Sequence, residues 1–184
     1  MNRFFSRSLV VMVTLGFLFV LSSCAFESDE TIAAGGTWEL AGTYGSERWV
    51  ITDTSITYSS DYGSGFSTVY SANIVSFSND GLNAGDITLT TGGDDPFDPG
   101  FAVIQYTYVN NAGTGEAGKY NVFRWADNAA DRDTRDFTQG YKDATGSGDT
   151  DYTNDVFDTA GAAESGATNA AGYFAYASTG AVRQ

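Results

Sequence analysis

From Gly36 onward, the sequence alternates between residues that favour strands and residues that favour turns. Short runs rich in Thr, Val, Ile and aromatic residues are separated by clusters of Gly, Asp, Asn and Ser. This pattern is typical of many short antiparallel strands joined by tight connections, as in sandwiches and barrels. No helical pattern of about 10–15 residues separates the strands, so a parallel α/β fold is disfavoured.

The expected strands lie at 37–41, 48–53, 55–59, 66–78, 86–91, 101–109 and 119–126, with a weaker one at 135–141. Within 66–78 the alternation changes phase at Val75, which predicts a bulge or bend. Both faces of 101–109 are largely apolar, so this strand is expected to contact the core on one face and to be covered on the other. A helix is expected from the cap residues 153–155 through Ala163, followed by a last strand at 173–178.

The first residues of the chain have the pattern of a secretory signal. Residues 1–8 carry two arginines and no acidic residue, and residues 9–21 form an almost uninterrupted apolar run. A membrane-spanning helix needs about 20 apolar residues, and this run is shorter. We therefore expect residues 1–23 to be removed, residues 24–35 to form an acidic tether, and residues 36–184 to form one folded domain.

The segment Leu21-Ser22-Ser23-Cys24 resembles the lipobox of bacterial lipoprotein precursors, in which a branched apolar residue and two small residues precede a cysteine that is lipidated. Cys24 is the only cysteine of the chain. The resemblance implies an exported protein held to a membrane by acyl chains on Cys24. Ala25 stands where the family often uses Asp for retention in the inner membrane, so an outer membrane is expected where the source has two membranes.

Gly36-Thr37-Trp38, at the start of the first expected strand, resembles the Gly-x-Trp signature of the lipocalin family. The resemblance implies that Trp38 packs at the closed base of a barrel, under an arginine for which Arg183 is the candidate. Residues 150–152 resemble the family's second motif, but they precede the expected helix instead of linking late strands. We expect an all-β fold, an antiparallel up-and-down (lipocalin-like) barrel of about eight strands with one short C-terminal helix. The order of features is also similar to small lipoproteins of spirochaetes, a family without an assigned function.

Composition removes most catalytic chemistry. The chain has no histidine and a single cysteine, so His-dependent nucleophilic catalysis, His-ligated metal or haem and thiolate chemistry are excluded. Paired carboxylates could still act as in glycosidases, but among 23 acidic residues a chance pair is easily found. We expect no enzyme activity, no cofactor and no metal centre. The formal net charge of −14 repels phosphates, so nucleic-acid binding is not expected either.

Two short motifs have a literal match to functional sites. Residues 113–118 fit Gly-x-Gly-x-x-Gly, but an alternating strand pattern follows instead of the helix that a nucleotide site needs, so a hairpin loop is expected. Residues 149–154 begin like an EF-hand loop, yet Ala160 stands where the bidentate Glu belongs. A looser calcium site stays open beside the interpretation as turns, either from Asp149, Asp151 and Asp155 or from Asp94, Asp95 and Asp98.

Aromatic residues make up 15% of the chain, and rings can form a core or line a ligand cavity. The candidate ligand-binding residues come from neighbouring expected strands: Tyr106, Tyr108, Tyr120, Phe123 and Trp125. The expected function is a non-catalytic, membrane-anchored barrel that binds a small apolar or amphiphilic ligand. The alternative is a structural or protein-interaction lipoprotein whose barrel is filled with side chains.

Overall fold

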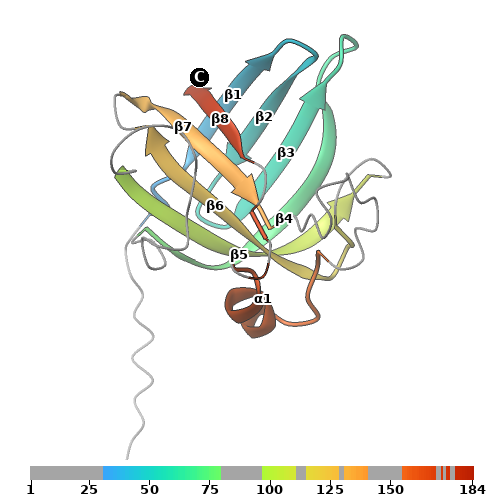
Figure 1. The fold of residues 1–184 in the computed structure, drawn as a ribbon. Helices are drawn as coiled ribbons and strands as arrows, with labels where there is room; N and C mark the ends of the chain where they lie inside the picture. The colour runs from blue at the N-terminus through green and yellow to red at the C-terminus, as the bar shows by residue number, and fades with distance from the viewer. Residues whose placement is uncertain are drawn as a thin grey trace, which may run out of the picture.

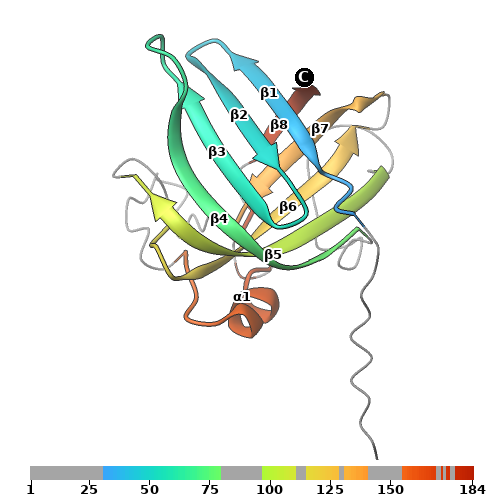
Figure 2. The same cartoon turned by 180° about the vertical axis from the view of Figure 1, so that it is seen from behind.

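The computed structural model describes residues 31–79, 97–110, 115–128, 131–140, 155–168, 171, 173–174 and 177–184. In these ranges eight strands form one closed antiparallel barrel, in which each strand pairs with the next along the chain and β8 returns to β1 (Figures 1 and 2). The strands are β1 (Gly36–Gly42), β2 (Gly45–Ile51), β3 (Ser55–Asp61), β4 (Ser67–Ser78), β5 (Phe97–Val109), β6 (Tyr120–Asn128), β7 (Asp131–Gln139) and β8 (Ser178–Arg183). With the short helix α1 (Ala160–Gly166), this confirms the predicted up-and-down barrel.

The predicted bulge in β4 is confirmed. Ile74 pairs with Ile104 of β5, while Ser76 pairs with Val103, so β4 contains one extra residue between the two pairs. That residue is Val75, which is 50% exposed. The extra residue reverses the alternation of β4 at this point, as the phase change in the sequence indicated. The strand expected at 86–91 lies outside the described residues.

The helix starts later than predicted. Thr159 caps α1, and its side chain accepts a hydrogen bond from the amide of Ala162 at 3.2 Å. Phe157, which was expected to be helical, instead exchanges two backbone hydrogen bonds of 2.9 Å with Tyr120 and extends the sheet. The last strand is also displaced along the sequence, because β8 runs over Ser178–Arg183 and not over 173–178.

Helix α1 covers the outer face of β5 and β6 (Figure 1). The apolar residues between helix and sheet are Phe101, Val103, Val122, Ala163, Ala167, Tyr173 and Phe174. Arg124 also points outward from β6, and its guanidinium lies 3.8 Å from the centre of the Phe174 ring. The expectation that 101–109 is covered on both faces is therefore confirmed for residues 101–106, whereas Thr107 and Tyr108 are exposed.

Residues 31–35, here called the closing segment, lie against the end of the barrel where β1 begins. Ile32 is 4% exposed and Ala34 is fully buried. The amide of Ile32 donates to Asp53, and the amide of Ala33 donates to Asn79 at 2.7 Å. The sequence predicts that these residues belong to the short, polar and acidic tether at 24–35. They belong instead to the packed fold and close one end of the barrel.

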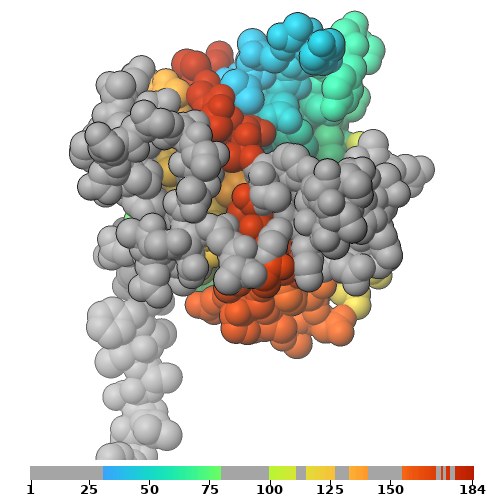
Figure 3. Space-filling model, viewed as in Figure 1, coloured from blue at the N-terminus to red at the C-terminus, as the bar shows by residue number. Residues whose placement is uncertain are grey.

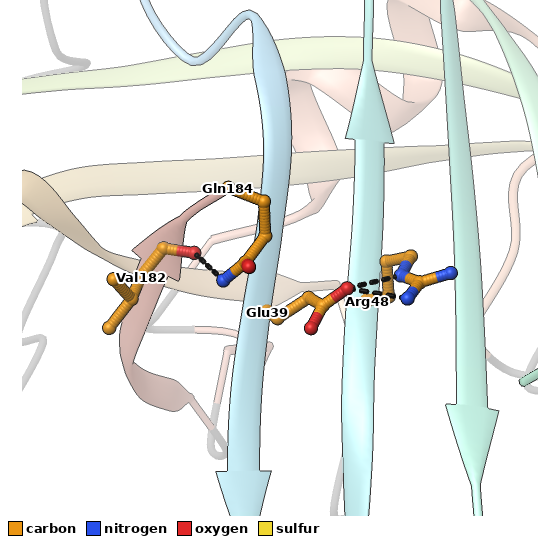
Figure 4. Close-up of polar contacts among 4 residues, drawn as sticks. All are labelled: Glu39, Arg48, Val182 and Gln184. Carbon is orange, nitrogen blue, oxygen red and sulfur yellow. Dashed lines mark hydrogen bonds and ion pairs between the residues drawn. The ribbon is translucent and has the colours of Figure 1, made fainter.

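The opposite end of the barrel is its mouth, where the β1–β2 and β3–β4 turns project side by side at the top of Figure 3. Pairing between β1 and β8 is short, with Trp38 opposite Arg183 and Glu39 opposite Val182. On the outer face, Arg48 of β2 forms an ion pair with Glu39 of β1, as Figure 4 shows. The Nε and Nη2 atoms of Arg48 lie 2.6 Å and 2.5 Å from Oε1 of Glu39. The first and last strands therefore contact each other mainly toward the closed end.

The stability of the barrel is expected to depend on Phe137, a residue of β7 that is 1% exposed. Replacing Phe137 with Ala removes a ring that contacts three other rings and leaves a cavity, at a cost of about 3–5 kcal/mol. The measurement is the free energy of unfolding in urea. The control is Tyr44→Ala, since Tyr44 is 92% exposed and its loss should change stability by less than about 0.5 kcal/mol. Equal losses in both variants would contradict this view of the core.

Candidate functional site

The structure separates the five candidate ligand-binding residues into two groups. Tyr106, Phe123 and Trp125 lie in the barrel interior with exposed fractions of 1% or less. Tyr108 is 50% exposed, and Tyr120 packs with the cluster under α1 on the outside of the barrel. The five rings therefore do not line one cavity.

Two features of the sheet explain this separation. Tyr106 pairs with Ala72 and Tyr108 pairs with Ser71, so β5 holds one extra residue, Thr107, between the two pairs. This bulge turns Tyr108 away from the face that Tyr106 occupies. Tyr120 differs by an odd number of positions from Phe123 and Trp125, so strand alternation alone places it on the other face.

The interior rings contact one another directly. The aromatic core comprises Trp38, Trp49, Tyr58, Tyr70, Tyr106, Phe123, Trp125 and Phe137. Phe137 lies near its centre, with ring centroids 5.0 Å from Trp49, 5.5 Å from Phe123 and 5.8 Å from Trp38. These separations are those of packed aromatic pairs.

The contacts continue from Trp49 toward the mouth. Trp49 stacks on Tyr58 at 5.3 Å, and Tyr58 and Tyr106 each lie 5.4 Å from Tyr70. Ring-to-ring contact therefore runs from the closed end to the mouth. These contacting rings take up part of the barrel interior, where a carried ligand would have to lie.

Trp38 lies at the closed end and is fully buried. Its indole Nε1 donates to the carbonyl of Ala34 in the closing segment at 2.9 Å. The guanidinium groups of Arg135 and Arg183 lie 5.0 Å and 5.1 Å from its ring centroid. The structure thus places Arg183 against Trp38, where the lipocalin resemblance implied an arginine.

One side of the mouth is closed by polar side chains of β5, β6 and β7. Asn121 is 1% exposed, and its Nδ2 donates to the carbonyls of Gly140 at 2.9 Å and Asp155 at 3.0 Å. The same nitrogen lies 3.1 Å from the Tyr106 hydroxyl, which also accepts a hydrogen bond from Gln139. These bonds satisfy buried polar groups where the ring packing ends.

The other side of the mouth is hollow. A solvent-open depression of about 290 Å³, here called the mouth pocket, is lined by Leu40, the turn from Gly42 to Glu47, and Tyr62. Gly45 is required by close packing, because a Cβ there would lie 2.8 Å from the Asp61 carbonyl and 2.9 Å from the Tyr62 ring. Tyr62 is 80% exposed, so its ring forms a wall that solvent reaches.

Glu47 brings a carboxylate to this pocket. It lies opposite Leu40, two positions from the buried Trp49, and therefore on the inner face of the barrel. The hydroxyl of Tyr58 donates to Glu47 Oε1 at 2.7 Å, and the hydroxyl of Ser178 donates to Oε2 at 2.6 Å. Sequence reasoning missed this residue because it precedes the expected strand 48–53, whereas β2 begins at Gly45.

The short motifs do not assemble into a site within the described chain. Gly118 is followed by the antiparallel strand β6 and not by a helix, which confirms that residues 115–118 belong to a hairpin connection. Asp94, Asp95, Asp149 and Asp151 lie outside the described residues, as does Cys24. Asp155 is 2% exposed, and no described group of three or more acidic or thiol side chains is placed to hold a metal ion.

None of the described helices is long and apolar enough to cross a membrane.

Burial shifts the acidity of the interior tyrosines. Desolvation raises the pKa of Tyr70 and of Tyr106 well above its usual value. The pKa of Tyr58 is also raised, first by burial and then by the neighbouring carboxylate of Glu47. All three hydroxyls are therefore held in the neutral form over the physiological range.

These raised pKa values predict a loss of stability in alkali. The unfolded chain releases its tyrosine protons near about pH 10, whereas the folded chain retains them, so stability is full below that pH and falls as the pH rises above it. Tyr70→Phe removes one such group and should reduce the drop in melting temperature between neutral and strongly alkaline buffer. Tyr44→Phe changes an exposed residue and should leave the drop unaltered. An identical pH profile in both variants would refute the explanation.

No model of a known protein family, no curated protein and no solved structure matches this chain. The assignment of a function therefore depends on the physical properties of the barrel and of its two ends.

Proposed function

We propose that this chain is an exported, lipid-anchored protein without catalytic activity, whose barrel is filled by its own side chains and serves as a rigid scaffold. Its function would then lie on the surface that the scaffold displays. The observation that carries this proposal is the continuous contact of rings from Trp38 to Tyr106 through the barrel interior. Ligand carriage inside the barrel would require space among rings that already contact one another.

The anchor is supported by the pattern that precedes the fold. The apolar run at 9–21 ends just before Cys24, and Cys24 is the only cysteine of the chain. The described fold begins only seven residues later, at Thr31, whose carbonyl accepts a hydrogen bond from Asn79 at 2.8 Å. An acylated Cys24 would thus hold the barrel close to a membrane, in the outer membrane of a cell that has two.

The absence of catalysis is supported by composition. Without histidine, and with its one cysteine proposed to carry lipid, the chain lacks the groups that usually activate a nucleophile near neutral pH. The buried hydroxyls of Tyr70 and Tyr106 have a raised pKa, which makes them poor proton donors. A scaffold needs none of this chemistry.

Lipidation can be tested by changing the anchor residue in the full chain expressed in a bacterium. Cys24→Ser should abolish the incorporation of labelled palmitate, block cleavage by lipoprotein signal peptidase and leave the uncut precursor. The matched control is Ser23→Ala, which keeps a small residue before the cysteine and should be labelled and cleaved normally. Palmitate labelling that persists in the Cys24→Ser variant would rule out the anchor.

The filled barrel can be tested with its own tryptophans, which are 0%, 4% and 0% exposed at positions 38, 49 and 125. A short brominated fatty acid quenches indole fluorescence by contact. Titration of the full chain with this acid should leave the emission unchanged, because contacting rings leave it no room. The same acid should quench the urea-unfolded chain, which shows that the probe works. Saturable quenching of the folded protein would instead favour ligand carriage inside the barrel.

A further inference from the structure

The mouth pocket owes its shape to the end of the β1–β2 hairpin. Leu40 and Glu47 lie opposite each other on the inner face, and the next inward pair is Gly42 and Gly45, which have no side chains. A side chain at Gly45 would collide with the backbone of Asp61 and with the ring of Tyr62. The hairpin therefore leaves a hollow of about 290 Å³ directly beyond Leu40 and Glu47.

The carboxylate in this hollow is oriented but not neutralised. Glu47 accepts one hydrogen bond from Tyr58 of β3 and one from Ser178 of β8, and both donors are uncharged hydroxyls. Arg48 pairs with Glu39 and Lys119 pairs with Asp158, so neither of these two cations pairs with Glu47. Each carboxylate oxygen can accept more than one hydrogen bond, so Glu47 retains capacity for a charged donor.

We propose that the mouth pocket binds a small organic ammonium ion, with its charged group at Glu47 and its apolar body against Leu40 and Tyr62. An ammonium supplies the charge-assisted hydrogen bonds that the two hydroxyls do not. The exposed ring of Tyr62 offers an apolar face to the rest of the ligand. The negative net charge of the chain, −14, raises the local concentration of cations around the protein.

The alternatives of similar size fit less well. A fatty acid or another anion would be repelled by Glu47, which lies in the lining of the pocket. A calcium ion takes about six to eight oxygen ligands, usually with several carboxylates, and the lining offers the single carboxylate of Glu47. The volume lies at the lower limit of about 300 Å³ for small-molecule sites, which restricts the ligand to a small amine.

This inference is independent of the proposed scaffold function. It requires neither lipid on Cys24 nor space inside the aromatic core, because the pocket lies outside the ring packing at the mouth. Failure of the brominated fatty acid to bind would leave it intact. Conversely, a failure of amine binding would not touch the proposed anchor.

The experiment is NMR titration of the full chain with three probes of one shape, benzylamine, benzyl alcohol and benzoate. Benzylamine is protonated at neutral pH and should shift the backbone amides of residues 40–47 and 62. Its affinity should exceed that of benzyl alcohol by about tenfold or more, the expected gain for a hydrogen bond to a charged group. Benzoate should not bind. Equal binding of all three probes, or shifts confined to other parts of the barrel, would overturn the proposal.

Two variants test whether benzylamine binds in the mouth pocket. Glu47→Gln keeps the size of the side chain but removes its charge, and benzylamine affinity should fall by about tenfold or more. Glu164→Gln is the matched control, because Glu164 is exposed on α1, on the outside of the barrel, and affinity should not change. Affinity that is equal in the two variants would overturn the role of Glu47.

A third variant keeps the test decisive should Glu47→Gln fail to fold. Tyr62 is 80% exposed, so Tyr62→Ala is expected to fold normally. It removes the ring against which the benzyl ring would pack, and benzylamine affinity should fall by about two- to fivefold. An unchanged affinity in folded Tyr62→Ala would contradict the proposed position of the ligand.

Discussion

The indole of Trp38 connects the three parts of the molecule that close the barrel. It packs edge-on against Phe137 of the aromatic core, and its Nε1 is bonded to Ala34 of the closing segment. Arg183 of β8 lies over its ring and also donates to the carbonyl of Gly35 at 2.7 Å. Because β1 and β8 share only a short paired stretch, these side-chain contacts join the first strand to the last where backbone pairing is limited.

Much of this barrel could be predicted, because most of its strands obey the two-residue alternation of a sheet with one buried face. The alternation located strands β1 to β6 to within a few residues, and it also indicated the bulge at Val75. The helix start was not predictable in this way, since Phe157 is held extended by two backbone bonds to Tyr120, a residue distant in sequence. The buried position of Ile32 likewise depends on contacts with Asp53 that no local pattern encodes.

The candidate site was harder to predict than the fold, and single residues show why. The extra residue at Thr107 has no clear signature in a strand of mixed aromatic and polar residues, yet it determines that Tyr108 faces solvent. The outward position of Tyr120 followed from alternation and could have been predicted. The inward position of Glu47 also follows from alternation, because Glu47 lies two residues from the buried Trp49 and therefore on the same face of β2.

The closing segment has a consequence for how the molecule would stand on a bilayer. Residues 31–35 seal one end of the barrel, and seven residues can extend at most about 25 Å between Cys24 and Thr31. An anchor at Cys24 would therefore hold the sealed end toward the lipid and point the mouth away from it. Lipid leaving the same membrane would meet the sealed end, while solutes of the surrounding aqueous space would reach Glu47 and Tyr62 first.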